Sequence, residues 1–178
     1  NISDLNNWLA ANGGASASDV CSSITWSNDF STVSDGCGAS GSVTVIFTAT
    51  DDCGNDITTS ATFTIQDNTD PIISVQAADL TVQCDGNGNI SDLNNWLAAN
   101  GGASASDVCS SVTWSNDFST VSDGCGASGS VTVTFTATDD CGNDTTTSAT
   151  FTIQDNTDPI ISVQAADLTV QCDGNGNI

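Results

Sequence analysis

Aspartates gather at three points of this sequence, and no basic side chain is available to pair with them. The first point is DNTDP, residues 67–71, and the others are ASASDVC, residues 103–109, and TDDCGND, residues 138–144. The chain contains no lysine, arginine or histidine, so carboxylates that converge must be neutralised by an ion from solution. Calcium suits such a cluster, because it takes six to eight oxygen ligands from aspartate, asparagine and backbone carbonyls in flexible geometry.

We predict a calcium site where the 67–70 segment meets the unit that follows it. Its expected ligands are Asp67, Asp70, Asp107, Asp139, Asp140, Asn143 and Asp144, with Asp35 from a turn above. The equivalent groups elsewhere in the chain are Asp19, Asp51, Asp52, Asn55, Asp56, Asp123, Asp155 and Asp158. The alternative is that these acids only solvate a surface or suit high salt, which does not explain why they gather at the ends of strands.

A second candidate calcium loop is CDGNGNISDL, residues 84–93. Its oxygen-bearing side chains are Asp85, Asn87, Asn89, Ser91 and Asp92, and they resemble the one-three-five spacing of a calcium loop. However, Ile90 and Trp96 stand where that loop has glycine and glutamate. A hydrogen-bonded turn that leads into a helix explains the segment equally well.

Composition excludes several partners. The 178 residues carry 22 acidic groups, all aspartate, and a formal charge of -22. Nucleic acid and anionic membranes are excluded as partners, because both require cationic side chains. With 38% apolar residues and four tryptophans, the chain is expected to fold. No apolar run is long enough for a membrane span or a signal-peptide core, so we expect any export signal or anchor to lie outside this sequence.

The chain is a tandem repeat. Residues 1–88 recur as 89–176 with three differences, which are Ile24 against Val112, Ile46 against Thr134, and Ile57 against Thr145. The last two residues repeat the first two. We therefore expect either an excerpt of a longer array or a subunit that joins other copies head to tail.

Period-2 alternation predicts that each repeat consists mainly of short strands. It is clearest in SVTVTFTAT (130–138), SATFTIQ (148–154) and DLTVQC (79–84), and Val112 and Trp114 mark another strand. The alternation places Ile46 and Thr134 on an outward strand face. About seven short strands with a tryptophan on a central strand predict an all-β fold of tandem immunoglobulin-like β-sandwiches.

One segment in each repeat has helical periodicity instead. Leu93, Trp96 and Leu97 form one stripe, with Ser91 as the expected N-cap and Gly101 just past the end. Each sandwich is therefore expected to carry one short helical insert.

Domain boundaries are expected at the hinges that directly precede Pro71 and Pro159. Residues 71–154 then form a complete domain, and residues 1–66 form a domain that lacks its first strand. Residues 67–70 and 155–158 are the hinges, and residues 159–178 are the first strand of a further domain.

Eight cysteines, never in a CxxC pair, indicate disulfides of an exported protein rather than a zinc site. The topology of an immunoglobulin-like sandwich predicts the pairs Cys84–Cys125, Cys109–Cys141 and Cys21–Cys53. Cys37 and Cys172 are then expected to meet across neighbouring copies.

VTVTFTATDDCGN, followed by TFTIQDNTDPII and a tryptophan strand, resembles the HYR (hyalin repeat) and HYR-like immunoglobulin-fold modules of large secreted bacterial adhesins. The DNTDP hinge is similar to the calcium-binding linkers of cadherins. These resemblances imply an extracellular or cell-surface protein that acts as a stalk, filament or adhesive.

The leading functional hypothesis is a calcium-stiffened, disulfide-bonded extracellular filament or adhesin stalk whose partners are further copies of itself. The alternative is a module whose faces or loops bind glycan or protein. The near identity of the repeats favours the structural role, because a recognition site need not be copied into every unit. An enzyme is not expected, since a chain without histidine, lysine or arginine cannot build a serine or cysteine triad, a Schiff base or a phosphate clamp.

Overall fold

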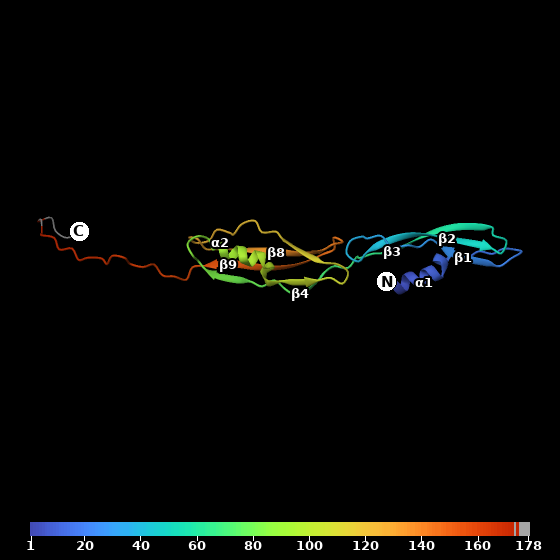
Figure 1. Ribbon diagram of the computed structural model, residues 1–178. Coiled ribbons are helices and arrows are strands. Elements are labelled where there is room, and N and C mark those ends of the chain that lie inside the picture. Colours follow the sequence, from blue (N-terminus) through green and yellow to red (C-terminus); the bar gives the residue numbers. More distant parts are fainter. Residues whose placement is uncertain (173, 175–178) are drawn as a thin grey trace.

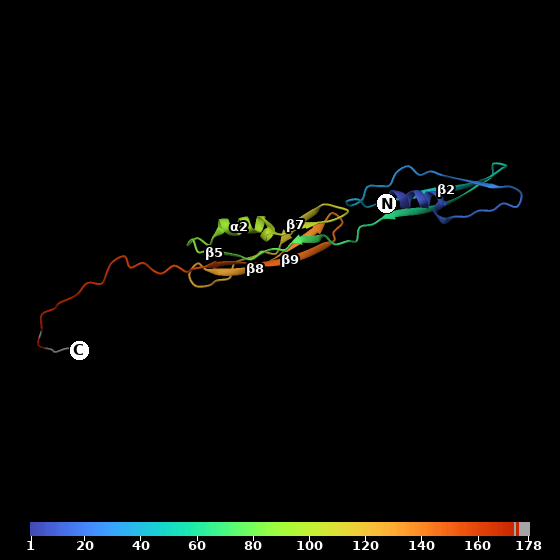
Figure 2. The same cartoon turned by 90° about the horizontal axis from the view of Figure 1, so that it is seen from below.

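A computed structural model describes residues 1–172 and 174, and it consists mostly of β-sheet with two short helices. Figures 1 and 2 show two β-rich units one after the other, with the segment after β9 leading away from the second unit. None of the helices in the described part of the chain has the length and apolar character that a bilayer crossing requires.

In the structure the boundary between the two repeats lies at the 67–70 hinge, so the first repeat is the unit before this hinge and the second repeat is the unit of residues 71–154. The first repeat forms one antiparallel sheet and one helix. The helix α1 (Ile2–Ala10) runs into a 3-10 turn, and the strands are β1 (Ile24–Asn28), β2 (Gly41–Asp51) and β3 (Asp56–Ile65). The sheet order is β1-β2-β3, so β3 lies at an edge.

The second repeat contains the same elements and additional strands. Its elements are β4 (Ile72–Val75), β5 (Leu80–Gln83), α2 (Ile90–Ala98), β6 (Ser104–Ser106), β7 (Val112–Asn116), β8 (Gly129–Asp139) and β9 (Asp144–Gln154). The main sheet has the order β5-β9-β8-β7, with β5 parallel to β9 and the other pairs antiparallel. Strands β4 and β6 form a separate antiparallel pair.

The strands predicted at 79–84, 112–114, 130–138 and 148–154 and the predicted helix are present. Residues 159–172, the described part of the expected strand at 159–178, form no strand within this chain, and the expected N-cap is wrong. Helix α2 begins at Ile90 with Asn89 at the N-cap, so Ser91 lies inside the first turn. The side-chain amide of Asn89 donates to the Gln83 carbonyl and to the Asp92 carboxylate, both at 3.0 Å. These bonds hold Asn89 in a left-handed conformation, which an asparagine tolerates, and the helix starts directly after it.

Helix α2 packs its apolar stripe on the main sheet. The Trp96 ring meets Phe135 edge-on, with ring centroids 5.2 Å apart, and lies 5.6 Å from Phe151. The Trp96 indole N–H donates to the Ala78 carbonyl, 3.0 Å away. Leu93 completes the stripe inside the same core. The polar edge of the tryptophan is thus satisfied while its rings are buried.

The first repeat has the same aromatic packing with less burial. Trp8 lies 5.3 Å from Phe47 and 5.5 Å from Phe63, close to the spacings in the second repeat. Phe63 and Trp8 are nevertheless only half-buried, whereas Phe151 is fully buried and Trp96 is 7% exposed. The difference follows from the sheet edge, because β5 covers β9 whereas no strand in the described part of the chain covers β3.

This difference predicts unequal costs for one substitution made in the two repeats. Phe151→Ala should lower the free energy of unfolding by about 3 to 5 kcal/mol, because it leaves a cavity in a closed core. Phe63→Ala is the matched control and should cost only about 1 to 2 kcal/mol, since much of that ring already meets solvent. Urea denaturation at low protein concentration measures both, and equal losses would contradict this account of the edge.

Candidate functional site

The junction between the two repeats brings a small group of polar side chains together. One carboxylate oxygen each of Asp67 and Asp107 and the sulfur of Cys109 all lie within 4.8 Å of one another. Asp67 follows β3, whereas Asp107 and Cys109 come from the loop between β6 and β7. The group therefore takes side chains from both repeats, and only their packing at the junction creates it.

Asp67 is the least satisfied of these groups. It is only 9% exposed, and its Oδ1 accepts a hydrogen bond from the Thr69 backbone N–H at 3.1 Å. Its Oδ2 is buried and has no hydrogen-bond partner among the described residues. A buried carboxylate oxygen without a partner is costly, so Asp67 Oδ2 is the least stable polar atom of this group.

Asp107 is held in place by its own loop. Its Oδ1 accepts from the backbone N–H groups of Cys109 at 2.8 Å and Ser110 at 3.0 Å. The bond from Cys109 is the largest influence on the pKa of Asp107, which the hydrogen bonds lower despite partial burial. A lowered pKa keeps this carboxylate charged at neutral pH, and its contribution to stability is lost only as the pH falls below the usual value of 3.8.

Asp139 ends β8 beside this group and is 5% exposed. Burial is the strongest single influence on it and would raise its pKa. Hydrogen bonds from Asn143 and from the Cys141 backbone together outweigh burial, so the pKa is lowered and the side chain is ionised. The Asn143 side-chain amide also donates to the Asp67 carbonyl at 3.3 Å, which ties the hinge to the β8–β9 turn.

Cys109 experiences the field of these carboxylates. Burial of the thiol, followed by the negative charges of Asp67, Asp107 and Asp139, raises its pKa above 9.0. The thiol is therefore protonated at neutral pH. The other ligand atoms of this group are carboxylate oxygens, the type of ligand that a hard ion such as calcium prefers.

The other predicted ligands lie outside this close group. Asp140 accepts hydrogen bonds from Ser111, from its hydroxyl at 2.8 Å and from its backbone N–H at 3.2 Å. The exposed members of the predicted set around the junction are Asp35, Asp70, Asp140 and Asp144. Asp123, Asp155 and Asp158 are exposed as well, Asp123 before β8 and the other two after β9. The structure therefore brings fewer of the predicted ligands close together than expected, since the carboxylates of the close group are those of Asp67 and Asp107.

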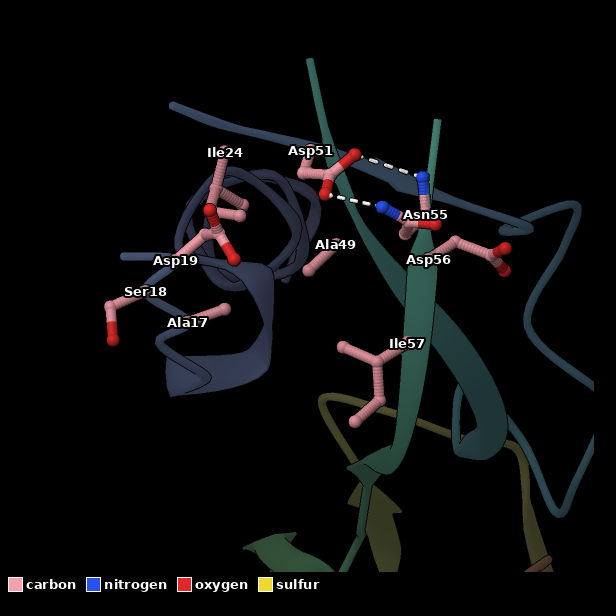
Figure 3. Close-up of a pocket in the computed structure, with 9 residues that line it drawn as sticks. All are labelled: Ala17, Ser18, Asp19, Ile24, Ala49, Asp51, Asn55, Asp56 and Ile57. Carbon is pink, nitrogen blue, oxygen red and sulfur yellow. Dashed lines mark hydrogen bonds between the residues drawn. The ribbon is translucent and has the colours of Figure 1, made fainter. Parts of the chain in front are cut away.

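The first repeat has the counterparts of Asp107 and Asp139, which are Asp19 and Asp51, and they line an open pocket. A pocket of about 170 Å³ lies there, and its polar lining includes Asp19, Asp51, Asn55 and Asp56, which Figure 3 shows. Asp51 accepts from the Asn55 backbone at 2.9 Å and from its side-chain amide at 2.8 Å, as Asp139 does from Asn143. Asp52 instead bonds Ser23, as Asp140 bonds Ser111. The pocket has no hinge aspartate in it.

The second candidate loop adopts the hydrogen-bonded turn. Asp85 Oδ1 accepts from the backbone N–H groups of Asn87 at 2.7 Å and Asn89 at 3.0 Å. These bonds lower the pKa of Asp85. Asn89 in turn donates to the Asp92 carboxylate. The oxygens that a calcium ion would need are largely occupied by the turn itself.

The cysteine pairing differs from the prediction. Cys37 and Cys141 form a disulfide that links the two repeats, so the expected Cys109–Cys141 bond is wrong, as is the expected pairing of Cys37 with Cys172 of another copy. The cysteines that carry free thiols in the described residues are Cys21, Cys53, Cys84, Cys109, Cys125 and Cys172. The predicted pairs Cys84–Cys125 and Cys21–Cys53 are therefore also not formed.

The reason for the different pairing is the position of the 35–40 turn. This turn of the first repeat lies on the loops of the second, where the Ala39 backbone N–H donates to the Cys109 carbonyl at 2.8 Å. Gly38 approaches the same carbonyl so closely that an added Cβ would lie 2.7 Å from it. The prediction already placed Asp35 near the junction, and the same reasoning applied two residues later would have placed Cys37 there.

Peptide mapping under non-reducing conditions should recover a cross-linked pair that contains Cys37 and Cys141. Cleavage beside aspartate or aromatic residues separates the relevant peptides. The loop-entropy model assigns about 4 to 5 kcal/mol to a bond that closes a loop of this length, so Cys37→Ser should make the junction markedly easier to open with urea. A Cys109–Cys141 peptide in its place would overturn this assignment.

Cys109 should react slowly with iodoacetamide in calcium-free buffer at pH 8. Its raised pKa leaves little thiolate, so its rate should increase with a midpoint above pH 9.0. Asp67→Asn removes one of the neighbouring charges and should lower that midpoint. The exposed Cys21, at the equivalent position of the first repeat, is the internal control. Rates that are equal at the two positions and unchanged by Asp67→Asn would refute the electrostatic coupling.

No protein-family model matches this sequence, and no curated protein matches it either. The likeness to hyalin repeats therefore stands on the quoted motifs alone. The function of this chain has to be inferred from the geometry of the junction.

Proposed function

We propose that this chain is a structural repeat of an extracellular filament or adhesin stalk, in which calcium stiffens the junction between successive repeats. The observation that carries the proposal is the buried, unpartnered Oδ2 of Asp67 beside Asp107. In a chain without lysine, arginine or histidine, no side chain can neutralise that pair. A divalent cation held by oxygens would do so.

Calcium fits this position better than a soft metal. Asp67, Asp107 and Asp139 supply carboxylate oxygens, and backbone carbonyls and water can complete a coordination shell of flexible geometry. The only sulfur in the close group belongs to Cys109, whose raised pKa keeps it protonated beside these acids. A thiolate-seeking metal would first have to remove that proton.

A cation at this position would act as a mechanical link. Asp67 belongs to the segment that leaves the first repeat, and Asp107 belongs to a loop of the second. Binding to both would restrict bending at the hinge, in addition to the Cys37–Cys141 bond. A stalk or filament needs such stiffness, because each flexible joint shortens its reach.

The proposed architecture of each repeat is an immunoglobulin-like sandwich with a helical insert. It is supported by the short antiparallel strands, by the tryptophan on β7, and by the loops gathered at the end that meets the preceding repeat. The resemblance to hyalin repeats supports the extracellular setting, and the disulfide is consistent with an oxidising compartment.

Calcium titration of the dilute chain tests this function. We expect binding with a dissociation constant on the order of 10⁻⁴ to 10⁻³ M, the range of extracellular calcium modules. Asp67→Asn should weaken it about tenfold or more. Asp158→Asn makes the same charge change in an exposed segment and serves as the control.

Thermal unfolding provides the second readout of the same test. Calcium should raise the melting temperature of the natural chain and of Asp158→Asn, because it binds the folded state. In chelator, Asp67→Asn should be at least as stable as the natural chain, since it removes a buried unpaired charge. No calorimetric signal at millimolar calcium, or equal binding by Asp67→Asn, would end the proposal.

A further inference from the structure

We propose that residues 159–172 of one copy dock on the open edge of β3 in a second copy and complete its first repeat. The inference rests on the proposed role as a repeating structural unit, and it specifies the surface and the segment that join two copies. In the second repeat, the identical segment 71–84 already covers β9, the strand equivalent to β3.

The donor has the same sequence as a segment that is already paired within the chain, and the acceptor β3 differs from the partner strand β9 only at Ile57, which corresponds to Thr145. Residues 159–172 repeat residues 71–84 without a difference, and the latter form β4 and β5. In the second repeat, Leu80 pairs with Phe151 and Val82 with Ile153 in parallel register. A shift of 88 residues places Leu168 opposite Phe63 and Val170 opposite Ile65.

The hydrogen bonds of the satisfied pair have unused counterparts. Around β5, the Ala78 carbonyl accepts from Trp96, the Asp79 carboxylate accepts from the Thr150 backbone, and the Cys84 backbone donates to Gln154. The corresponding groups of the first repeat belong to Trp8, Thr62 and Gln66, and they make no equivalent bond within the described residues. Docking of residues 159–172, called the tail from here on, would supply all three partners.

Both surfaces are apolar and uncovered. In the segment after β9, Leu168 is 86% exposed and Val170 is 75% exposed, whereas their counterparts Leu80 and Val82 pack against the core. Phe63 on the open edge is half-buried, and its counterpart Phe151 is fully buried. An open strand edge of this kind pairs readily with an extended segment.

Two pockets of the first repeat lie where the second repeat holds the docked segment. The pocket in Figure 3 contains Asp19 and Asp51, the counterparts of Asp107 and Asp139, and Asp155 is the counterpart of Asp67 that would enter it. A second pocket, of about 240 Å³, is lined by Ala15, Ser16, Ala17, Trp26, Ile57, Thr58 and Thr59. Strand β4 pairs with β6, whose Ser104 and Ala105 are the counterparts of Ser16 and Ala17 in this lining. Ile73 pairs with Ala105, so the docked Ile161 is placed beside Ala17 at this pocket.

The same shift pairs two exposed thiols across the contact. Shifted by one repeat of 88 residues, the Cys37–Cys141 bond corresponds to a bond between Cys125 of one copy and Cys53 of the next. Both of these cysteines are free and exposed in this chain. An S–S bond forms as two S–H bonds break, and the two protons and two electrons pass to a disulfide oxidant such as oxidised glutathione. Figures 1 and 2 show that the tail leads away from its own first repeat, so the acceptor belongs to another copy.

Non-reducing electrophoresis of the chain, incubated with oxidised glutathione, tests the contact. We expect a ladder of covalent multimers that disappears with reductant. Cys125→Ser and Cys53→Ser should each abolish the ladder, while an equimolar mixture of the two variants should yield a covalent dimer and nothing larger. Cys21→Ser is the control and should leave the ladder intact. A ladder that survives Cys53→Ser would overturn the proposed register.

Docking of the strand is tested without disulfides. A chain that ends at residue 158 should stay monomeric in sedimentation, and a peptide of residues 159–172 with Cys172→Ser should bind it one to one and raise its melting temperature. A peptide of the same composition in scrambled order is the control. No binding beyond that of the scrambled peptide would refute the proposal. Because binding should persist in chelator, this result is independent of whether calcium occupies the hinge.

Discussion

The parallel pairing of β5 with β9 is the contact on which the rest of the structure depends. It joins residues about 70 positions apart, closes the edge of the main sheet and covers Phe151. It also fixes the path of the chain before β5, and with it the position of Asp67 against the loops of the second repeat. The first repeat, with nearly the same sequence but no such strand, keeps its core half-open. Burial here is decided by strand addition rather than by local sequence.

The absence of cationic side chains is the second constraint. Several carboxylates accept hydrogen bonds from backbone N–H groups in their own turns, as Asp107, Asp139 and Asp85 do. These bonds stabilise the charged form and shape the loops at the same time. Asp67 is the exception, because burial at the junction leaves one of its oxygens without any such donor. The proposed calcium site at the junction depends on that one oxygen atom.

The secondary structure could be read from the sequence because it follows from local patterns. Alternation of valine, phenylalanine and alanine with threonine predicts β8, and the spacing of Leu93 and Trp96 predicts α2. The N-cap was misplaced because Ser91 and Asn89 are both good capping residues, and hydrogen bonds to Gln83 and Asp92 select Asn89. The predicted disulfides are wrong because they follow the topology of a single sandwich, whereas the 35–40 turn brings Cys37 to the loops of the second repeat.

The sequence by itself determined the repeat, the strands, the helix and the absence of any side chain that could neutralise the aspartates, since composition and periodicity are properties of the chain alone. It also placed Asp67 and Asp107 near one junction, because loops at one end of a β-unit must meet the hinge that precedes it. Only the tertiary structure decided which oxygens converge, that Cys109 lies among them and that Cys37 bonds Cys141. The physical reason is that these contacts join groups tens of residues apart, and their distances depend on how two folded units pack.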